Sequence, residues 1–186
     1  MHNGHFDILA HIYDRVIKYA DGEAMISLAN LPAAGTLLDA GGGTGRVANS
    51  LRGLVDQIVI ADLSYGMLQQ AVTKGLATSC AETETLPFPD ASFERIILVD
   101  ALHHVADQRV TANELWRVLK PGGRLVVVEP DIKCFGVKLI ALFEKLVLMR
   151  SHFLSQHRMM EVFYFPDSKT NVVLQKCSVW LTLDKN

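Results

Sequence analysis

Short apolar runs alternate along this chain with segments in which apolar residues recur every three or four positions. The runs that predict strands are 36–39, 57–61, 76–80, 93–99 and 124–129. The helical patterns between them cover 46–54, 64–74 (with Ser64 as N-cap) and 108–119, the last ended by Pro121-Gly122-Gly123. This alternation is typical of βαβ units, and strands so rich in Val, Ile and Leu indicate a parallel sheet covered by helices on both faces. We therefore predict a doubly wound, mostly parallel α/β fold.

The two ends of the chain depart from the alternation. Residues 6–30 carry apolar side chains near a helical period, and 135–149 form the most apolar helical segment. Beyond it, 160–165 and 171–176 flank a turn-forming stretch and predict a C-terminal antiparallel hairpin. We expect one domain over 1–186: an N-terminal helical segment (1–30), a core (31–150), and the hairpin with a tail (151–186).

Size and charge restrict the function. A chain of 186 residues suits one domain that can bury a core without disulfides or a structural metal. Its formal charge of −2, with Lys and Arg scattered, gives no basic field, so no nucleic-acid partner is expected. No window is long and apolar enough for a transmembrane segment, because Lys138, Glu144 and Lys145 interrupt the helix at 135–149. Contact of this helix with a membrane surface is left open, but burial is favoured.

The cysteines and the N-terminus bear on the compartment. Cys80, Cys134 and Cys177 are odd in number, far apart and without CxxC spacing. This pattern argues against a disulfide framework and a zinc site, and it fits a reducing cytosol. The first residues carry charge throughout, unlike a signal peptide. We expect a cytoplasmic protein that binds no metal.

A glycine-rich loop after the first strand is the main candidate binding feature. It reads Asp39-Ala-Gly-Gly-Gly-Thr-Gly45, so Gly41, Gly43 and Gly45 have GxGxG spacing. Missing side chains allow a tight turn and close approach of a ligand, and the next helix offers free N–H groups. Asp62 ends the second strand, where a carboxylate can accept hydrogen bonds from ribose hydroxyls. Together these features predict a cofactor that contains a nucleoside.

Two details favour a cationic cofactor over a dinucleotide. The loop lacks the GxGxxG spacing, because Arg46 and Val47 follow Gly45. Asp39 also places a carboxylate beside the loop. That charge does not suit a pyrophosphate, but it suits a sulfonium or an ammonium group.

The sequence further resembles the class I S-adenosylmethionine methyltransferases. The resemblance lies in LLDAGGGTGRVA (37–48), IADLSYGML (60–68), AETETLPFPDASFERIILVDALHHV (81–105) and ELWRVLKPGGRLVVVEP (114–130). It covers about residues 6–150 and is strongest to the branch of the ubiquinone and menaquinone C-methyltransferases. It implies a Rossmann-like fold, S-adenosylmethionine as cofactor and S-adenosylhomocysteine as product.

The resemblance also implies a cofactor site. Gly41 and Gly43, with Gly45 in the same loop, would pass under the methionine part, and Asp39 would help to hold its amino group. The remaining implied contacts are Asp62 with the ribose, Leu63, Met67, Ala81 and Glu82 with the adenine, and Asp100 near the transferable methyl group. Cys80 stands where many members have Asp, so one adenine contact is in doubt. From the residues alone, Asp39 can instead cap its own turn, Asp62 can cap a helix, and Leu63 and Met67 can be core.

His103 and His104 are the candidate catalytic residues, because histidine accepts protons near neutral pH. As neighbours they point in different directions, so one is expected to pack and the other to face substrate. Glu129 and Asp131 are alternative bases that can instead cap chain ends or pair with Lys133.

The predicted function is methyl transfer to a small, lipophilic or aromatic acceptor. Phe135, Leu139, Phe143 and Met149 would wall its pocket, although core packing explains the same residues. By resemblance, the N-terminal segment would be a lid, with Tyr13 as a lid contact or ordinary packing. The alternatives are a macromolecule methyltransferase, against which VDALHH stands where an NPPY-like motif is expected, and a non-catalytic S-adenosylmethionine-binding protein. The sequence does not indicate the oligomeric state.

Overall fold

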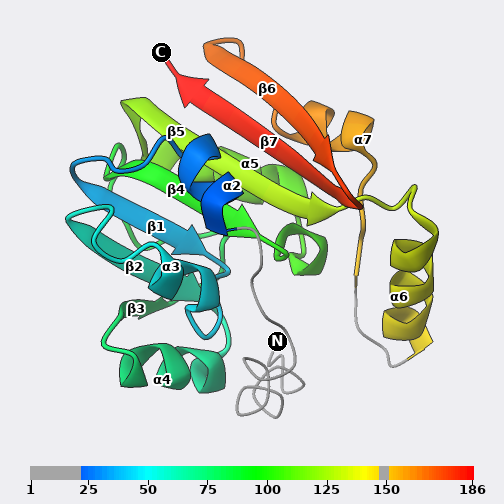
Figure 1. The fold of residues 1–186 in the computed structure, drawn as a ribbon, viewed down its shortest axis with the longest axis horizontal. Helices are drawn as coiled ribbons and strands as arrows, with labels where there is room; N and C mark the ends of the chain where they lie inside the picture. The colour runs from blue at the N-terminus through cyan, green and yellow to red at the C-terminus, as the bar shows by residue number, and fades with distance from the viewer. Residues whose placement is uncertain (1–21, 147–150) are drawn as a thin grey trace.

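The computed structural model describes residues 22–146 and 151–186, except for the side chains of 140–141 and 143–146 (Figure 1). Its centre is a seven-stranded sheet in the order β3-β2-β1-β4-β5-β7-β6. Strands β1 to β5 are parallel, and β7 runs antiparallel between β5 and β6. The strands are β1 Thr36–Ala40, β2 Gln57–Asp62, β3 Ala77–Cys80, β4 Phe93–Val99, β5 Leu119–Pro130, β6 Ser168–Gln175 and β7 Ser178–Lys185. The predicted doubly wound, mostly parallel sheet is confirmed.

Helices cover both faces of this sheet. The described helices are α2 Gly22–Leu28, α3 Arg46–Ser50, α4 Tyr65–Thr73, α5 Gln108–Val118, α6 Phe135–Leu146 and α7 Gln156–Val162, with a short 3-10 helix, η1, at Leu102–His104. Leu37 and Leu38, neighbours on β1, belong to different hydrophobic clusters, as alternating strand positions must. One cluster includes buried residues of α2, α3 and α4, and the other those of α5 and α7. The near-continuous apolar strands are therefore explained by burial on both faces.

The predicted C-terminal hairpin is present, but its predicted position in the sequence was wrong. Residues 160–165 are not a strand, because 156–162 form α7, and Met159 and the C-cap residue Phe163 face the core one turn apart. The hairpin pairs β6 with β7 instead, and its turn contains Lys176 at φ 54°. The predicted tail is in fact the buried strand β7, on which Trp180 is fully enclosed.

Several predicted elements differ at their ends. Of the helix expected over 6–30, the structure describes α2, and Tyr13 lies outside the described residues. The helix predicted over 46–54 ends at Ser50, shortly before Gly53 at φ 77°. The predicted N-cap of α4 is confirmed, because Ser64 Oγ accepts from Met67 N at 3.2 Å.

The motif segments 86–90 and 114–117 hold each other through Arg117. Its guanidinium donates to the carbonyl oxygens of Leu86 at 3.1 Å and Phe88 at 2.9 Å. It also pairs with Asp90 at 2.7 Å and with Glu114 at 2.8 Å, and Glu114 accepts in turn from Leu86 N. These segments therefore fix a loop against α5.

Among the helices that the structure describes, none has the length and apolar character needed to cross a membrane.

Candidate functional site

The predicted site residues meet at the carboxyl ends of the parallel strands. Asp39 lies near the end of β1 and Asp62 ends β2, while Asp100 follows β4 and Glu129 lies near the end of β5. Because β2, β1, β4 and β5 are neighbours, these four carboxyl groups share one edge of the sheet. This edge is where open α/β sheets bind ligands.

Gly41 is required where the glycine loop meets the segment after β4. It has φ +65°, and a Cβ built on it would lie 2.6 Å from the Cβ of Ala101. Gly45, at φ +73°, has a packing role, since its Cβ would lie 2.6 Å from Ile60 Cδ1. The loop therefore approaches β4 at one end and anchors α3 on the sheet at the other.

Asp62 is held rigidly between the glycine loop and the start of α4. Its Oδ2 accepts from Gly43 N at 2.8 Å, and its Oδ1 accepts from Ser64 N at 2.8 Å. The N-cap of α4 is Ser64 and not Asp62. Asp62 instead fixes the backbone of Ser64 by accepting from its amide. A carboxylate oxygen can accept more than one hydrogen bond, and this group is half-buried rather than enclosed.

Asp39 lies beneath its own loop and is only 1% exposed. Its carboxyl carbon would be 2.5 Å from a Cβ on Gly42, so only glycine fits above it. Burial raises its pKa to about 7, with the amide of Ala48 opposing, Asp62 adding to the rise and Arg46 lowering it. Its Oδ2 has no hydrogen-bond partner within the described part of the chain. Two interpretations of Asp39 fit this position. Its carboxyl group can support its own glycine turn, or it can face a cationic group of a ligand.

The predicted adenine contacts Leu63, which precedes α4, and Met67, which lies in its first turn, differ in exposure. Met67 is buried, and its sulfur would lie 4.0 Å from a Cβ on Gly43, so it packs under the glycine loop. Leu63 is exposed beside it. An apolar surface thus adjoins the Asp62 carboxylate, and ligand contact of both residues stays a prediction.

The end of β3 and the residues after it lie beside Asp62 and Leu63. Ala81 N donates to the carbonyl oxygen of Asp62 at 3.0 Å, and the Cys80 thiol donates to that of Leu63 at 3.7 Å. Glu82, the next residue, is exposed. The backbone here is positioned for contact, while the expected acidic side chain is replaced by the exposed thiol of Cys80.

His103 and Glu129 form a buried pair. His103 Nδ1 lies 2.6 Å from Glu129 Oε2, and both side chains are buried. Glu129 Oε1 accepts from Ala101 N at 2.8 Å and from Leu102 N at 2.7 Å. Sequence reasoning named both side chains but missed the pairing, which spans 26 residues. The available signal was that His103 follows β4 and that Glu129 lies near the end of the neighbouring strand β5.

His104 has a different environment from His103. Burial, and then the neighbouring His103, lower the pKa of His104 to about 3. Such a ring is a poor proton acceptor near neutral pH. The His103 ring lies between His104, at 4.0 Å between ring centres, and Phe153, stacked at 4.3 Å. His152 N donates to the His103 carbonyl oxygen at 2.7 Å, so residues 151–154 cover this pair.

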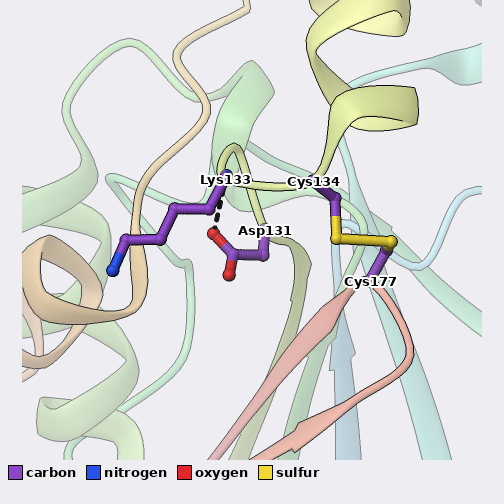
Figure 2. The surroundings of a disulfide bond; sticks show 4 residues. All are labelled: Asp131, Lys133, Cys134 and Cys177. Atoms are coloured by element: carbon purple, nitrogen blue, oxygen red, sulfur yellow. Dashed lines mark hydrogen bonds between the residues drawn. A yellow bond between two sulfur atoms is a disulfide. The ribbon is translucent and has the colours of Figure 1, made fainter.

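Asp100 and Asp131 flank the pair. Asp100, at φ 52°, lies 3.6 Å from the Arg46 guanidinium, and burial raises its pKa, with Glu129 adding to the rise and Arg46 opposing it. Asp131 is buried and accepts from Lys133 N at 2.9 Å (Figure 2). Asp131 thus caps a turn, as one of the two sequence-based interpretations predicted.

The expectation against a disulfide framework is wrong for one pair of cysteines. Cys134 and Cys177 are bonded, with Cα atoms 5.8 Å apart (Figure 2). They meet because Asp131 N donates to the Cys177 carbonyl oxygen at 2.8 Å, which joins the β5–α6 turn to the β6–β7 turn. Spacing along the sequence could not show this contact. The cysteines no longer support a reducing cytosol, and the compartment stays a prediction.

Helix α6 carries an exposed apolar stripe. Phe135, Leu139 and Leu142 are 76%, 52% and 56% exposed, whereas Val137 is buried. Core packing therefore does not explain Phe135 and Leu139 within the described structure. The side chain of Phe143, and Met149, lie outside what the structure describes. In the same described part, no cluster of three or more His, Cys, Asp or Glu is arranged to hold a metal ion.

The chain is similar to known methyltransferases in sequence and in fold. Residues 38–127 match a family model described as a methyltransferase domain. The ubiquinone/menaquinone biosynthesis C-methyltransferase UbiE from a Marinomonas species is 35% identical over 115 residues, which are 56% of this chain and 46% of that protein. The chain thus spans about half the length of the curated relatives it matches.

Two solved structures share the fold. A SAM-dependent methyltransferase from Thermotoga maritima, described as a possible histamine N-methyltransferase, has a TM-score of 0.80 at 22% identity, over 97% of this chain and 98% of that one. The geranyl diphosphate C-methyltransferase from Streptomyces coelicolor, solved with Mg²⁺, geranyl diphosphate and S-adenosyl-L-homocysteine, has a TM-score of 0.74 at 13% identity, over 89% and 77%.

Proposed function

Because this chain belongs to the class I S-adenosylmethionine-dependent methyltransferase family, we propose that it binds S-adenosylmethionine and catalyses transfer of its methyl group to a small, lipophilic or aromatic acceptor. The observation that carries the proposal is the Asp62 carboxylate, fixed by the amides of Gly43 and Ser64 at the carboxyl edge of the sheet. A rigid acceptor for a ribose diol beside a glycine loop is what a nucleoside cofactor requires.

The residues present fit this cofactor. The buried Oδ2 of Asp39 lacks a partner among the described residues, and a nearby cation would stabilise the ionised carboxyl group. Asp62 would hold the ribose, Leu63 and Met67 would border the adenine, and the backbone of Gly41 and Gly43 would leave room for the methionine part. When bound, the cofactor supplies a methyl group activated by its sulfonium. The protein's contribution is alignment of two ligands and exclusion of water.

The acceptor class rests on the relatives and on α6. The UbiE relative is named for quinone biosynthesis, and the Streptomyces structure holds an isoprenoid acceptor. In this chain, the exposed stripe of Phe135, Leu139 and Leu142 supplies an apolar surface suited to such compounds. His103 rather than His104 is the proposed proton acceptor, since the pKa of His104 is lowered to about 3.

The proposed cofactor is tested by calorimetry, which compares ligand binding by the wild type and by the Asp62→Ala variant. We expect S-adenosylhomocysteine to bind the wild type and NAD not to bind. The variant should lose affinity by a factor of about ten or more, because hydrogen bonds to a charged group are worth about 1.5–3 kcal/mol. Asp56→Ala is the matched control, since Asp56 accepts from Gly35 N in the turn before β1, at the opposite end of that strand. Tight NAD binding, or equal affinity of both variants, would contradict the proposal.

Methyl-labelled cofactor tests the acceptor. Incubation with separate lipid, small-molecule and macromolecule fractions should place the label in the lipid or small-molecule fraction. Label in RNA or protein alone would support the macromolecule alternative. Cofactor binding without transfer to any fraction would support the non-catalytic alternative.

A further inference from the structure

We propose that Glu129 is a positioning residue that fixes the tautomer of His103, so that His103 accepts a proton from the methyl acceptor through Nε2. The inference rests on the proposed function and adds to it a requirement on the acceptor. The nucleophile must carry an acidic proton, as in a phenol, a quinol or an enol.

Glu129 is anchored before it meets the ring. Its Oε1 accepts two backbone hydrogen bonds, from Ala101 N at 2.8 Å and Leu102 N at 2.7 Å. These donors fix the carboxylate at the start of η1. The second oxygen, Oε2, is then directed at His103 Nδ1 at 2.6 Å. A carboxylate held this way can only accept, so the proton between the two groups belongs to Nδ1.

The orientation of the ring is fixed as well. Phe153 stacks on His103 with planes 14° apart, and His104 lies tilted against it at 50°. Because Nδ1 donates to Glu129, the neutral ring carries its lone pair on Nε2. The ring therefore exchanges protons on the side away from Glu129.

The pair adjoins the cofactor loop. Ala101, whose amide binds Glu129, is the residue whose Cβ approaches Gly41 so closely that no side chain fits there. The Glu129–His103 pair and the glycine loop thus share one boundary, at the start of η1. A proton acceptor there is placed between the cofactor loop and the covering residues 151–154.

The other charged groups nearby do not replace Glu129. Asp100, with its raised pKa, faces Arg46 at 3.6 Å, so these two form a separate pair. His104 is neutral near physiological pH because its pKa is lowered to about 3. From the segment that covers the pair, His152 contacts His103 through its backbone amide.

The proton transfer is balanced as follows. The O–H bond of the acceptor breaks, an N–H bond forms at His103 Nε2, and the electron pair left on the acceptor makes it a nucleophile. His103 becomes a cation beside the Glu129 carboxylate, which stabilises it. Its proton passes to water after product leaves.

Glu129→Gln tests the tautomer directly. The amide oxygen of Gln can still accept from Ala101 N and Leu102 N, but its NH₂ group donates towards His103 Nδ1. The proton must then move to Nε2. In ¹⁵N-histidine-labelled protein, with His103→Gln used for assignment, we expect the wild type to show a protonated Nδ1 and the variant a protonated Nε2. A protonated Nε2 in the wild type at neutral pH, or no change in the variant, would overturn the inference.

Glu84→Gln is the matched control. Glu84 Oε1 also accepts from two backbone amides, of Ala106 at 2.7 Å and Asp107 at 3.2 Å, but among the described residues it has no histidine partner. This control should leave the His103 tautomer unchanged. A shift of the tautomer in both variants would show a general disturbance of the segment and would contradict a specific role for Glu129.

Activity supplies the second readout, with the acceptor found by labelling. Glu129→Gln should lower kcat by a factor of about 100 or more, the usual contribution of a general base, with the affinity for S-adenosylhomocysteine within twofold. The loss should be smaller at high pH, where the acceptor ionises unaided. Failure to bind S-adenosylhomocysteine at all refutes the proposed function, whereas an unchanged tautomer or a pH-independent loss refutes only this inference.

Discussion

At the scale of single residues, the buried carboxyl group of Asp39 links stability to pH. Burial raises its pKa from 3.8 to about 7. Between these values the folded protein binds a proton that the unfolded chain releases. The stability that this proton contributes is fully present below pH 3.8 and is lost as the pH rises through 7.

Asp39→Asn should remove this pH dependence, because the amide imitates the protonated acid and cannot ionise. The free energy of unfolding of the variant should gain on that of the wild type by up to about 1.4 kcal/mol per pH unit between pH 4 and 7, and the difference should level off above 7. Urea unfolding at a series of pH values measures it. Parallel stability curves for the two proteins would show that Asp39 is ionised throughout.

The position of one predicted site residue followed from the sequence, while its contact with a ligand stays a prediction. Asp62 was predicted because a carboxylate that ends the second strand must lie beside the glycine loop, and the structure places it there. The Glu129–His103 pair could not be derived from the sequence, since it depends on which strands are neighbours and on a turn of η1. Gly45 belongs to the loop motif, but its packing against Ile60 appears only in three dimensions.

At the scale of elements, Arg117 joins the motif segments 86–90 and 114–117. Arg117→Ala should lower the free energy of unfolding by about 2 kcal/mol, because it removes charged hydrogen bonds to Leu86, Phe88, Asp90 and Glu114. The affinity of the folded variant for S-adenosylhomocysteine should stay unchanged. Urea unfolding and calorimetry measure the two effects.

Arg158→Ala is the control for that substitution, since the exposed pair of Arg158 with Glu161 should contribute less than about 0.5 kcal/mol. Equal stability losses in the two arginine variants would contradict a specific role for Arg117. Loss of cofactor affinity in Arg117→Ala at full stability would instead place the loop at 86–90 in the binding site.

The C-terminal hairpin shows why element prediction failed at one place. The segment Met159–Phe165 offers apolar residues both in alternation and one helical turn apart, so periodicity alone does not decide between strand and helix. The helix forms because it brings Met159 and Phe163 into the same hydrophobic cluster. Strand β7 was missed because it follows the expected hairpin, although its inward positions, such as Trp180, are all buried.

At the scale of the whole molecule, the parallel part of the sheet followed from the sequence and the antiparallel part did not. Alternating strands and helices permit little besides a parallel sheet, and the glycine loop indicates the edge at which a ligand is expected. The insertion of β7 between β5 and β6 depends on contacts between segments far apart in the chain. The same holds for the disulfide, which joins the end of the parallel part to the hairpin.

The disulfide between Cys134 and Cys177 gives the last prediction, because it closes a loop across a sequence separation of 43 residues. After mild oxidation, the denatured protein should show one reactive thiol, Cys80, and three after reduction. Reduction should lower the free energy of unfolding by up to about 4 kcal/mol, the loss expected when the unfolded chain is released from a loop of this size. The double variant Cys134→Ser/Cys177→Ser should have the lower stability with or without reductant, while Cys80→Ser should respond like the wild type. Three thiols in the oxidised protein would show that the pair does not form, and the hydrogen bond from Asp131 N to the Cys177 carbonyl oxygen would then still join the β5–α6 turn to the hairpin.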